Sequence, residues 1–345
     1  MEATLQQIRN RLGNRRLAAA FGLVVVLVVL FATPQLLGTR LAAAFGRLDQ
    51  ADAKWLWLAG VGFAVAVVGA AGSWRSAIRL CGGRLSLTDA CARYGAGSLV
   101  NTFVPARAGD AVRIGLFSRV LPNRERLWTT GGAFAALGAA RAVVLAVLVV
   151  AGAIAGFVPL WPLLVALALV CAGVAAVLHA RRYESAGGRL SHLLDAFRAL
   201  GRRPGGAARL VAWIALSTAG RLAAATAVGA ALGIHQPLAA AIVIVPALDI
   251  AGLVPITPGN VGVTSGAIAI AFQANGVSFT HGLAAGIAFH AVETAVGIMF
   301  GLASLVWLAP YPTPAVRRIA LLATAASWCL GIAGAFSATV LVPLV

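Results

Sequence analysis

Charged residues are scarce in this sequence of 345 residues: they make up 11% of it, whereas hydrophobic residues make up 61%. The mean hydropathy of +0.93 is too high for a soluble globular domain. A soluble protein is therefore excluded, and the composition is typical of a chain that crosses a membrane many times.

Lysine is almost absent, because Lys54 is the only one in the chain. The net charge of +17 therefore comes from arginine, against only 10 acidic residues. In a polar chain such an excess would favour nucleic acid as the partner. In a chain this apolar it favours anionic lipid, so we expect a membrane and an anionic phospholipid as partners, and no nucleic acid.

Motifs for catalysis and metal binding are also missing. The four cysteines show no C-x-x-C spacing, which argues against a disulfide framework or a zinc site. No glycine-rich phosphate loop with a lysine is present, and no serine, histidine and aspartate occur in a hydrolase order. His290 and Glu293 share one helix face, but two ligands without a third favour a buried hydrogen-bonded pair over a metal site. We therefore expect no enzyme activity, no cofactor and no metal.

Long apolar runs are abundant, and about 20 apolar residues suffice for a helix to cross a bilayer. They predict an all-α, polytopic membrane protein with a single integral membrane domain over residues 1–345. Seven crossings are predicted, at 17–38, 55–73, 127–157, 160–180, 210–233, 281–308 and 319–343. The arginine-rich segment 181–209 is predicted to be a cytoplasmic loop with a short amphipathic helix.

Two similar stretches interrupt these runs, around Pro105–Asp110 and around Pro255–Asn260. Both read Val-Pro, three residues, Gly, then Asp or Asn, and an apolar helical run follows each. Proline and glycine break a helix, and a short polar residue caps the next one. Broken helices at corresponding places in two halves are typical of a transporter's binding site. We predict re-entrant helical hairpins at about 88–121 and 237–275, although two surface turns, or two full spans at the second stretch, are alternatives.

The distribution of arginine predicts the topology. When the N-terminus is placed in the cytoplasm, most of the 27 basic residues fall on the cytoplasmic side, as the positive-inside rule requires. The C-terminus then lies outside the plasma membrane. Three spans separate the two hairpins, so the hairpins enter the membrane from opposite sides.

A family resemblance rests on the first stretch and on Pro255-Ile-Thr-Pro-Gly-Asn-Val-Gly262. In the first stretch the motif residues are Asn101, Pro105, Arg107, Gly109, Asp110 and Arg113. This pattern resembles the lysylphosphatidylglycerol synthase transmembrane family, the flippase-like membrane region of the multiple peptide resistance proteins. The sequence departs from the family pattern at Ser265, where a glutamate is expected, and around Arg141, which alone remains of Glu-Arg-x-x-Asp.

The resemblance implies movement of a phospholipid or lipid-linked headgroup between leaflets. The soluble catalytic domain of the synthase is not in these residues, so aminoacyl transfer is not expected. Two alternatives remain open: a solute or ion transporter of the same architecture, and a non-transporting membrane partner of an envelope-biosynthesis enzyme such as a glycosyltransferase.

The hairpin tips can bind an anion. We predict that Asp110 and Asn260 each cap a half-helix, whose free N–H groups favour negative charge. Arg107 and Arg113 add guanidinium groups, which bind phosphate in a bidentate manner. An alternative is that Arg113 only pairs with Asp110. Gly109 and Gly259 are predicted to have a positive φ or to allow close backbone approach, and both Pro–Gly segments to be non-helical. The predicted binding residues are Asn101, Arg107, Gly109, Asp110, Arg113, Pro258, Gly259, Asn260 and Gly262.

Five further polar residues lie inside predicted spans or hairpins: Arg141, Arg221, Asp249, His290 and Glu293. A lone charge at the bilayer centre costs roughly 2.5–3.5 kcal/mol on insertion scales. We therefore predict that the four charged side chains face the bundle interior with at least one arginine–carboxylate pair. The suggested pairs are Arg141–Glu293 and Arg221–Asp249.

Overall fold

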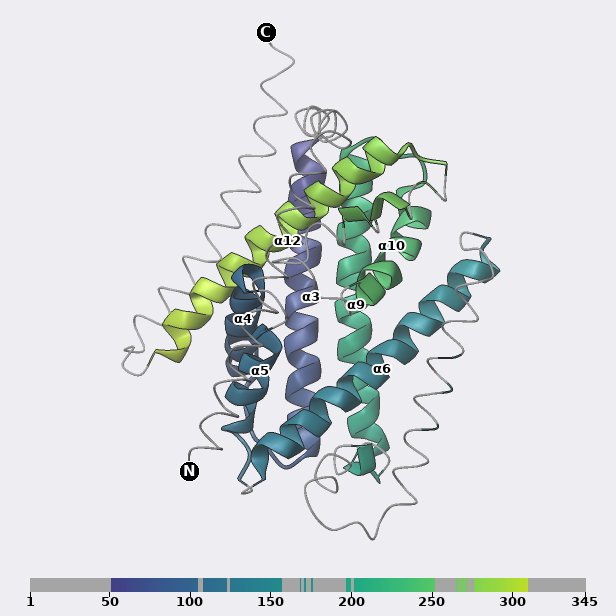
Figure 1. Cartoon of the computed structure of the whole chain (residues 1–345). Helices are drawn as coiled ribbons and strands as arrows, with labels where there is room; N and C mark the ends of the chain where they lie inside the picture. The colour runs from purple at the N-terminus through teal and green to yellow at the C-terminus, as the bar shows by residue number, and fades with distance from the viewer. Residues whose placement is uncertain are drawn as a thin grey trace, which may run out of the picture.

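The computed structural model describes residues 51–104, 108–122, 125–156, 202–251 and 276–309, the pieces 197–199, 265–266 and 268–270, and residues 168, 171, 175 and 273. Throughout these residues the regular structure is α-helical, as predicted. The helices are α3 (Ala53–Leu80), α4 (Leu87–Phe103), α5 (Ala108–Ser118), α6 (Arg126–Ile154), α9 (Pro204–Ala231), α10 (Pro237–Ala251) and α12 (Phe279–Leu308) (Figure 1).

Four of these helices, α3, α6, α9 and α12, are long and apolar enough to cross a membrane. They contain 28 to 30 residues each, or about 42–45 Å of helix, against a hydrocarbon core about 30 Å thick. Four of the seven predicted crossings are thereby confirmed as long apolar helices. The predicted spans 17–38 and 319–343, and nearly all of 160–180, lie outside the described residues.

Small residues bring α3 and α9 together as an antiparallel pair. A Cβ atom at Gly69 would lie 2.6 Å from the Ser217 backbone nitrogen, and one at Gly220 would lie 2.6 Å from the Gly62 carbonyl oxygen. The Ser217 hydroxyl donates a 2.8 Å hydrogen bond to the Ala66 carbonyl. Membrane helices associate through such close backbone contacts, because lipid offers no hydrophobic drive between them. This pair forms the centre of the described bundle.

Helices α4 and α5 form the predicted first hairpin. They are antiparallel, because the Arg93 Nε–H donates to the Leu116 carbonyl at 3.3 Å and Gly97 faces Gly109. The hairpin begins and ends at one end of the bundle, since a Cβ atom at Gly83 would lie 3.2 Å from Leu121. With about 25 Å and 16 Å of helix respectively, neither α4 nor α5 is long enough to cross the hydrocarbon core.

The predicted second hairpin is described only in part, as α10 and a few residues between 265 and 273. Its two ends meet, because the His281 Nε2 atom lies 3.0 Å from the Leu232 carbonyl oxygen. The first hairpin starts at the end of α3, and α9 starts at the same end, where Gly206 approaches Leu80. Because α9 runs away from that end, the contact between Leu232 and His281 lies at the opposite end of the bundle. The segment between α9 and α12 therefore begins and ends at the end of the bundle opposite to that of the first hairpin (Figure 1).

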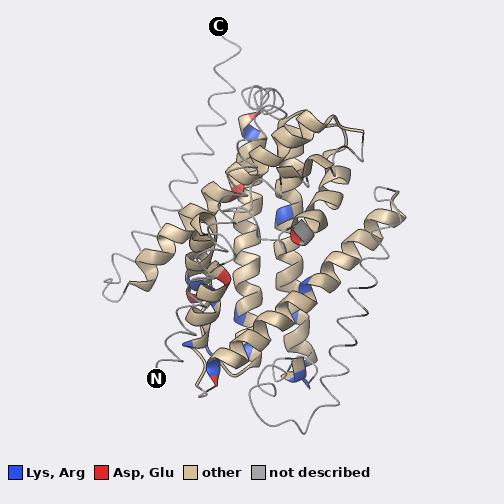
Figure 2. Ribbon diagram, viewed as in Figure 1, with Lys and Arg blue, Asp and Glu red and all other residues tan. Residues whose placement is uncertain are grey.

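Basic residues gather at one end of the described bundle. This end carries the last residues of α3, the loop before α4, and the first residues of α6 and α9; in Figure 2 most of the blue segments lie there. Lys54 lies at the other end, at the start of α3. This asymmetry is the one that the positive-inside rule associates with cytoplasmic exposure.

Candidate functional site

The tip of the first hairpin is closed by Asn101. Its Oδ1 atom accepts a 2.6 Å hydrogen bond from the Gly109 N–H, and its amide nitrogen lies 3.4 Å from Asp110 Oδ1. Asn101 thus satisfies a donor in the first described turn of α5, and Asp110 lies inside that turn. The prediction that Asp110 precedes and caps the helix is therefore wrong. Gly109 is also helical, so the prediction that it belongs to a non-helical segment is wrong.

Arg113 is held by the hairpin itself. Its side chain is 11% exposed, and one terminal nitrogen lies 2.6 Å from Asp110 Oδ1. The other donates to Ser98 Oγ at 2.7 Å, and the guanidinium carbon lies 4.0 Å from the centre of the Tyr94 ring. The pairing with Asp110, considered as an alternative from the sequence, is therefore formed. Arg113 binds the two helices to each other and is neutralised, so it is not a free binding charge; Arg107 lies outside the described residues.

Close backbone approach at Gly109 is confirmed. A Cβ atom there would collide with the Gly97 carbonyl oxygen and lie 2.5 Å from Asn101 Oδ1. We expect Gly109→Ala to separate α4 from α5 and to lower the free energy of unfolding by about 1–3 kcal/mol. Gly115→Ala is the matched control, because Gly115 lies on the same helix with open space around it. The measurement is unfolding in detergent, and equal stability of the two variants would contradict the expectation.

A network of charged side chains joins four helices at the centre of the bundle. Arg141 of α6 holds Asp249 of α10 in a bidentate contact, with Nε–Oδ2 at 2.7 Å and a terminal nitrogen 2.8 Å from Oδ1. Arg221 of α9 donates to the same Oδ1 atom at 2.7 Å. The predicted Arg221–Asp249 pair is confirmed, whereas the suggested Arg141–Glu293 pair is wrong. The reason is that α10 packs against both α6 and α9, which places Asp249 between the two arginines.

Glu293 of α12 is held more loosely. Its Oε1 atom lies 3.9 Å from Arg221, and its Oε2 atom lies 3.4 Å from His290 Nδ1. The contact with His290 is the pair predicted from their spacing. The Glu293 side chain remains 38% exposed, compared with 17% for Asp249. Two arginines and two carboxylates thus form a neutral group, in which Glu293 is the most accessible acid.

The hairpin tip and the charge network lie close together along α12. Helix α4 packs antiparallel to α12: Asp89 binds the Trp307 indole at 3.0 Å, and Leu99 faces Gly301. A Cβ atom at Gly297 would lie 3.8 Å from Thr102 Oγ1, near the end of α4. Glu293 is one helical turn beyond Gly297, so the hairpin ends about one turn from the network.

Comparison with known families decides the identity of the chain. The family model described as "Lysylphosphatidylglycerol synthase TM region" matches residues 17–301. The chain belongs to this family. No curated protein and no solved structure matches it. The match includes both hairpin regions and all members of the charge network, so the resemblance predicted from the sequence is confirmed and the chain is a membrane protein of a lipid-related family.

Several site residues predicted for this family member lie outside the described residues: Arg107, Pro258, Gly259, Asn260 and Gly262. Ser265, which stands where the family pattern has a glutamate, is described. It is 4% exposed, and its hydroxyl has no hydrogen-bond partner. It packs against α12, since a Cβ atom at Gly286 would lie 2.8 Å from the Ser265 Cα atom.

Residues that the sequence did not single out complete the site. Tyr94 and Ser98 bind Arg113, and Trp307 ties α12 to the start of α4. Tyr94, Ser98 and Asn101 recur every three or four residues along α4. This spacing places polar side chains on one helix face, and it is the signal that could have identified them.

Proposed function

We propose that this protein moves a phospholipid or lipid-linked headgroup between the two leaflets. The observation that carries the proposal is that the end of α4 lies about one helical turn from a partly exposed charge network, in a bundle where the first hairpin and the segment between α9 and α12 start from opposite ends. Family membership supports the same conclusion. The proposal includes that both hairpins are re-entrant in a plasma membrane, with the arginine-rich end and the N-terminus in the cytoplasm.

The network offers a place for an anionic headgroup. Arg221 makes one short contact, to Asp249, whereas Glu293 lies 3.9 Å away and the Arg221 Nε–H has no hydrogen-bond partner. This N–H is buried without a partner, so a phosphate that displaces Glu293 can satisfy it, because arginine binds phosphate in a bidentate manner. Arg107, near the hairpin tip in sequence, supplies a second charge for the same headgroup.

The side of the bundle beside Glu293 also suits a lipid. The Arg141 and Glu293 side chains are 37% and 38% exposed, so the network is not sealed inside the bundle. Phe103 and Val104, at the end of α4, are exposed apolar residues. A headgroup can therefore pass along the charged interior while its acyl chains stay in the apolar surroundings, without any need for a cofactor or a chemical reaction.

The experiment is lipid movement in proteoliposomes. Purified protein is reconstituted with fluorescent phosphatidylglycerol, phosphatidylethanolamine or a polyprenyl diphosphate lipid, and outer-leaflet label is bleached with dithionite. We expect Arg107→Ala to slow movement of the preferred lipid about tenfold or more, because a charge-assisted hydrogen bond to the headgroup is lost. Arg107→Lys should retain part of the rate.

Arg119→Ala is the control, since Arg119 is an exposed arginine in the turn after α5. Unchanged movement in correctly folded Arg107→Ala would contradict the anion site. If no lipid moves but the liposomes accumulate a soluble anion, the protein is a solute transporter. If neither moves, the role of a membrane partner for an envelope enzyme replaces the proposal.

A further inference from the structure

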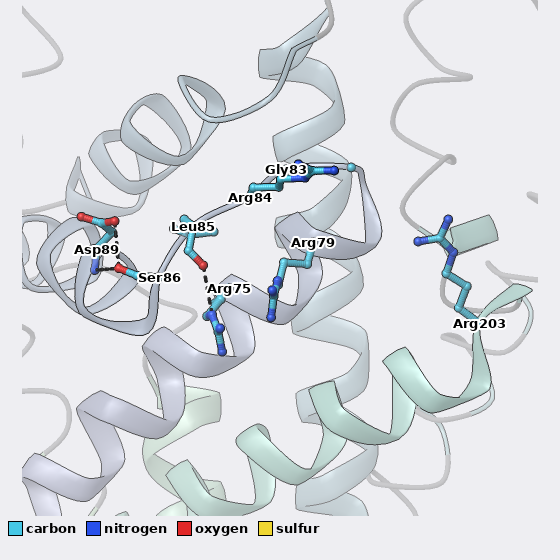
Figure 3. Close-up of a pocket in the computed structure, with 9 residues that line it drawn as sticks. Arg75, Arg79, Gly83, Arg84, Leu85, Ser86, Asp89 and Arg203 are labelled. Carbon is cyan, nitrogen blue, oxygen red and sulfur yellow. Dashed lines mark hydrogen bonds between the residues drawn. The ribbon is translucent and has the colours of Figure 1, made fainter.

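A second polar site lies at the arginine-rich end of the bundle, away from the hairpin tip. It is an open cavity of about 760 Å³ between the end of α3, the loop that leads to α4 and the start of α9 (Figure 3). Four arginines line it, and Ser86 and Asp89 complete its polar wall; the arginines are Arg75, Arg79, Arg84 and Arg203. No motif from the sequence and no part of the proposed translocation path includes this cavity.

The backbone around the cavity is well defined. Helix α3 ends with two hydrogen bonds, from the Gly82 N–H to the Arg79 carbonyl at 3.1 Å and from the Gly83 N–H to the Ile78 carbonyl at 2.9 Å. Gly82 has a φ of +91°. This is the Schellman arrangement, in which glycine adopts a left-handed conformation to end a helix. The turn fixes the loop that carries Arg84, and Arg75 Nε binds the loop's Leu85 carbonyl at 3.1 Å.

Helix α9 brings the fourth arginine to the same place. Its first turn contacts the end of α3, where a Cβ atom at Gly206 would lie 2.5 Å from Leu80 Cδ2. Arg203 is the N-cap residue of α9, and its exposed side chain lines the cavity on the side away from Ser86 and Asp89 in Figure 3. Arginines from three separate segments therefore converge, which an ordinary charged helix end does not require.

The positive charge of the cavity is not balanced by carboxylates. Within the described part of the chain, Arg79, Arg84 and Arg203 make no ion pair. Asp89, the one acid of the wall, accepts hydrogen bonds from Trp307 and Ser86 and lies 4.0 Å from Arg93. Partial burial raises the pKa of the Asp89 carboxyl, but these hydrogen bonds and the Arg93 charge outweigh it and hold the pKa below its usual value. Asp89 is thus ionised but engaged elsewhere.

We propose that this cavity binds a phosphate-bearing anion, as a site separate from the hairpin tip. Unpaired guanidinium groups from several segments match the several oxygens of a phosphate or diphosphate. Basic pockets at the ends of membrane helices take anionic lipid headgroups in the same way. The phosphate can belong to a phospholipid of the adjacent leaflet or to a soluble compound. In both cases the guanidinium groups would bind the phosphate oxygens.

The test is equilibrium binding to the full-length protein in an uncharged detergent, so that it does not depend on lipid movement. The probes are a fluorescent phosphatidic acid and inorganic pyrophosphate. The variant Arg79→Gln/Arg84→Gln/Arg203→Gln removes three cavity charges. The control Arg119→Gln/Arg126→Gln/Arg202→Gln removes three exposed arginines near the same end of the bundle that do not line the cavity.

We expect the cavity variant to weaken phosphatidic acid binding about 100-fold, at about fivefold per arginine, and the control to weaken it less than about threefold. The single variants Arg203→Gln and Arg202→Gln, at adjacent exposed positions, repeat the comparison with minimal risk to folding. If pyrophosphate binds as tightly as phosphatidic acid and competes with it, the ligand is a soluble phosphate compound. If only phosphatidic acid binds, the ligand is a lipid headgroup. Equal weakening in cavity and control variants, or none in either, would overturn the proposal.

Discussion

Asp249→Asn should lower the free energy of unfolding by about 3–5 kcal/mol, the largest effect that we expect from a single substitution. Asp249 is the shared partner of Arg141 and Arg221, at 2.7 Å from each. Asparagine keeps the shape but removes the charge, so two guanidinium groups remain with only Glu293, 3.9 Å from Arg221, to balance them. Breaking a buried pair by removing one partner is costly because the other charge stays uncompensated. The measurement is unfolding in mixed micelles, followed by circular dichroism.

A second substitution separates charge balance from shape. In Asp249→Asn/Arg141→Gln, the network retains Arg221 and Glu293 and is again neutral, so we expect part of the lost stability to return. Glu125→Gln is the control, because Glu125 is an exposed carboxylate at the start of the same helix as Arg141. Its effect should stay within about 0.5 kcal/mol. A double variant less stable than Asp249→Asn would show that shape and hydrogen bonding, and not charge, set the cost.

Gly220→Val should give the second-largest loss, about 2–3 kcal/mol. A Cβ atom at Gly220 would lie 2.6 Å from the Gly62 carbonyl oxygen and 2.7 Å from the Ala66 nitrogen. Both atoms belong to the backbone of α3, so no side chain can move aside and the two helices must separate. The hydrogen bond from Ser217 to Ala66 would then be lost as well.

The control for this prediction is Gly138→Val on α6. Gly138 also lies inside a long apolar helix, but a Cβ atom there meets open space. Both variants add the same side chain to a membrane helix, so they differ only in what that side chain contacts. Unfolding measurements that show the same loss for both would mean that helix propensity, and not the contact between α3 and α9, explains the effect.

The apolar runs predicted the class and the spanning helices well, because a membrane requires about 20 consecutive apolar residues whatever the neighbours are. The hairpin at α4 and α5 was also predicted, since Pro105 and the short flanking runs are local signals. The parity of the crossings also predicted that the segments around the two hairpins start from opposite ends of the bundle, as α3, α9 and α12 place them. These features depend only on the local sequence and on the order of segments along the chain. They can be predicted without knowing which helices are in contact.

The pairing of the charges could not be predicted in full. The sequence shows that Arg141, Arg221, Asp249 and Glu293 lie inside predicted spans or hairpins, where charges need partners. Which carboxylate meets which arginine depends on the order of helices around the bundle, and the sequence does not carry that order. For the same reason Asn101 was predicted to bind an anion, whereas its contact with Gly109 is visible only once α4 and α5 are side by side.

The order of the network along the chain has a consequence for how the protein is made. Both arginines are synthesised before either carboxylate, and Asp249 follows Arg141 by 108 residues. At about 5–20 residues per second, α6 waits for its partner for roughly 5–20 s. During that time a lone arginine at the bilayer centre costs at least roughly 2.5–3.5 kcal/mol. The early helices therefore carry unpaired arginines until α10 arrives, and the contacts with Asp249 then offset that cost.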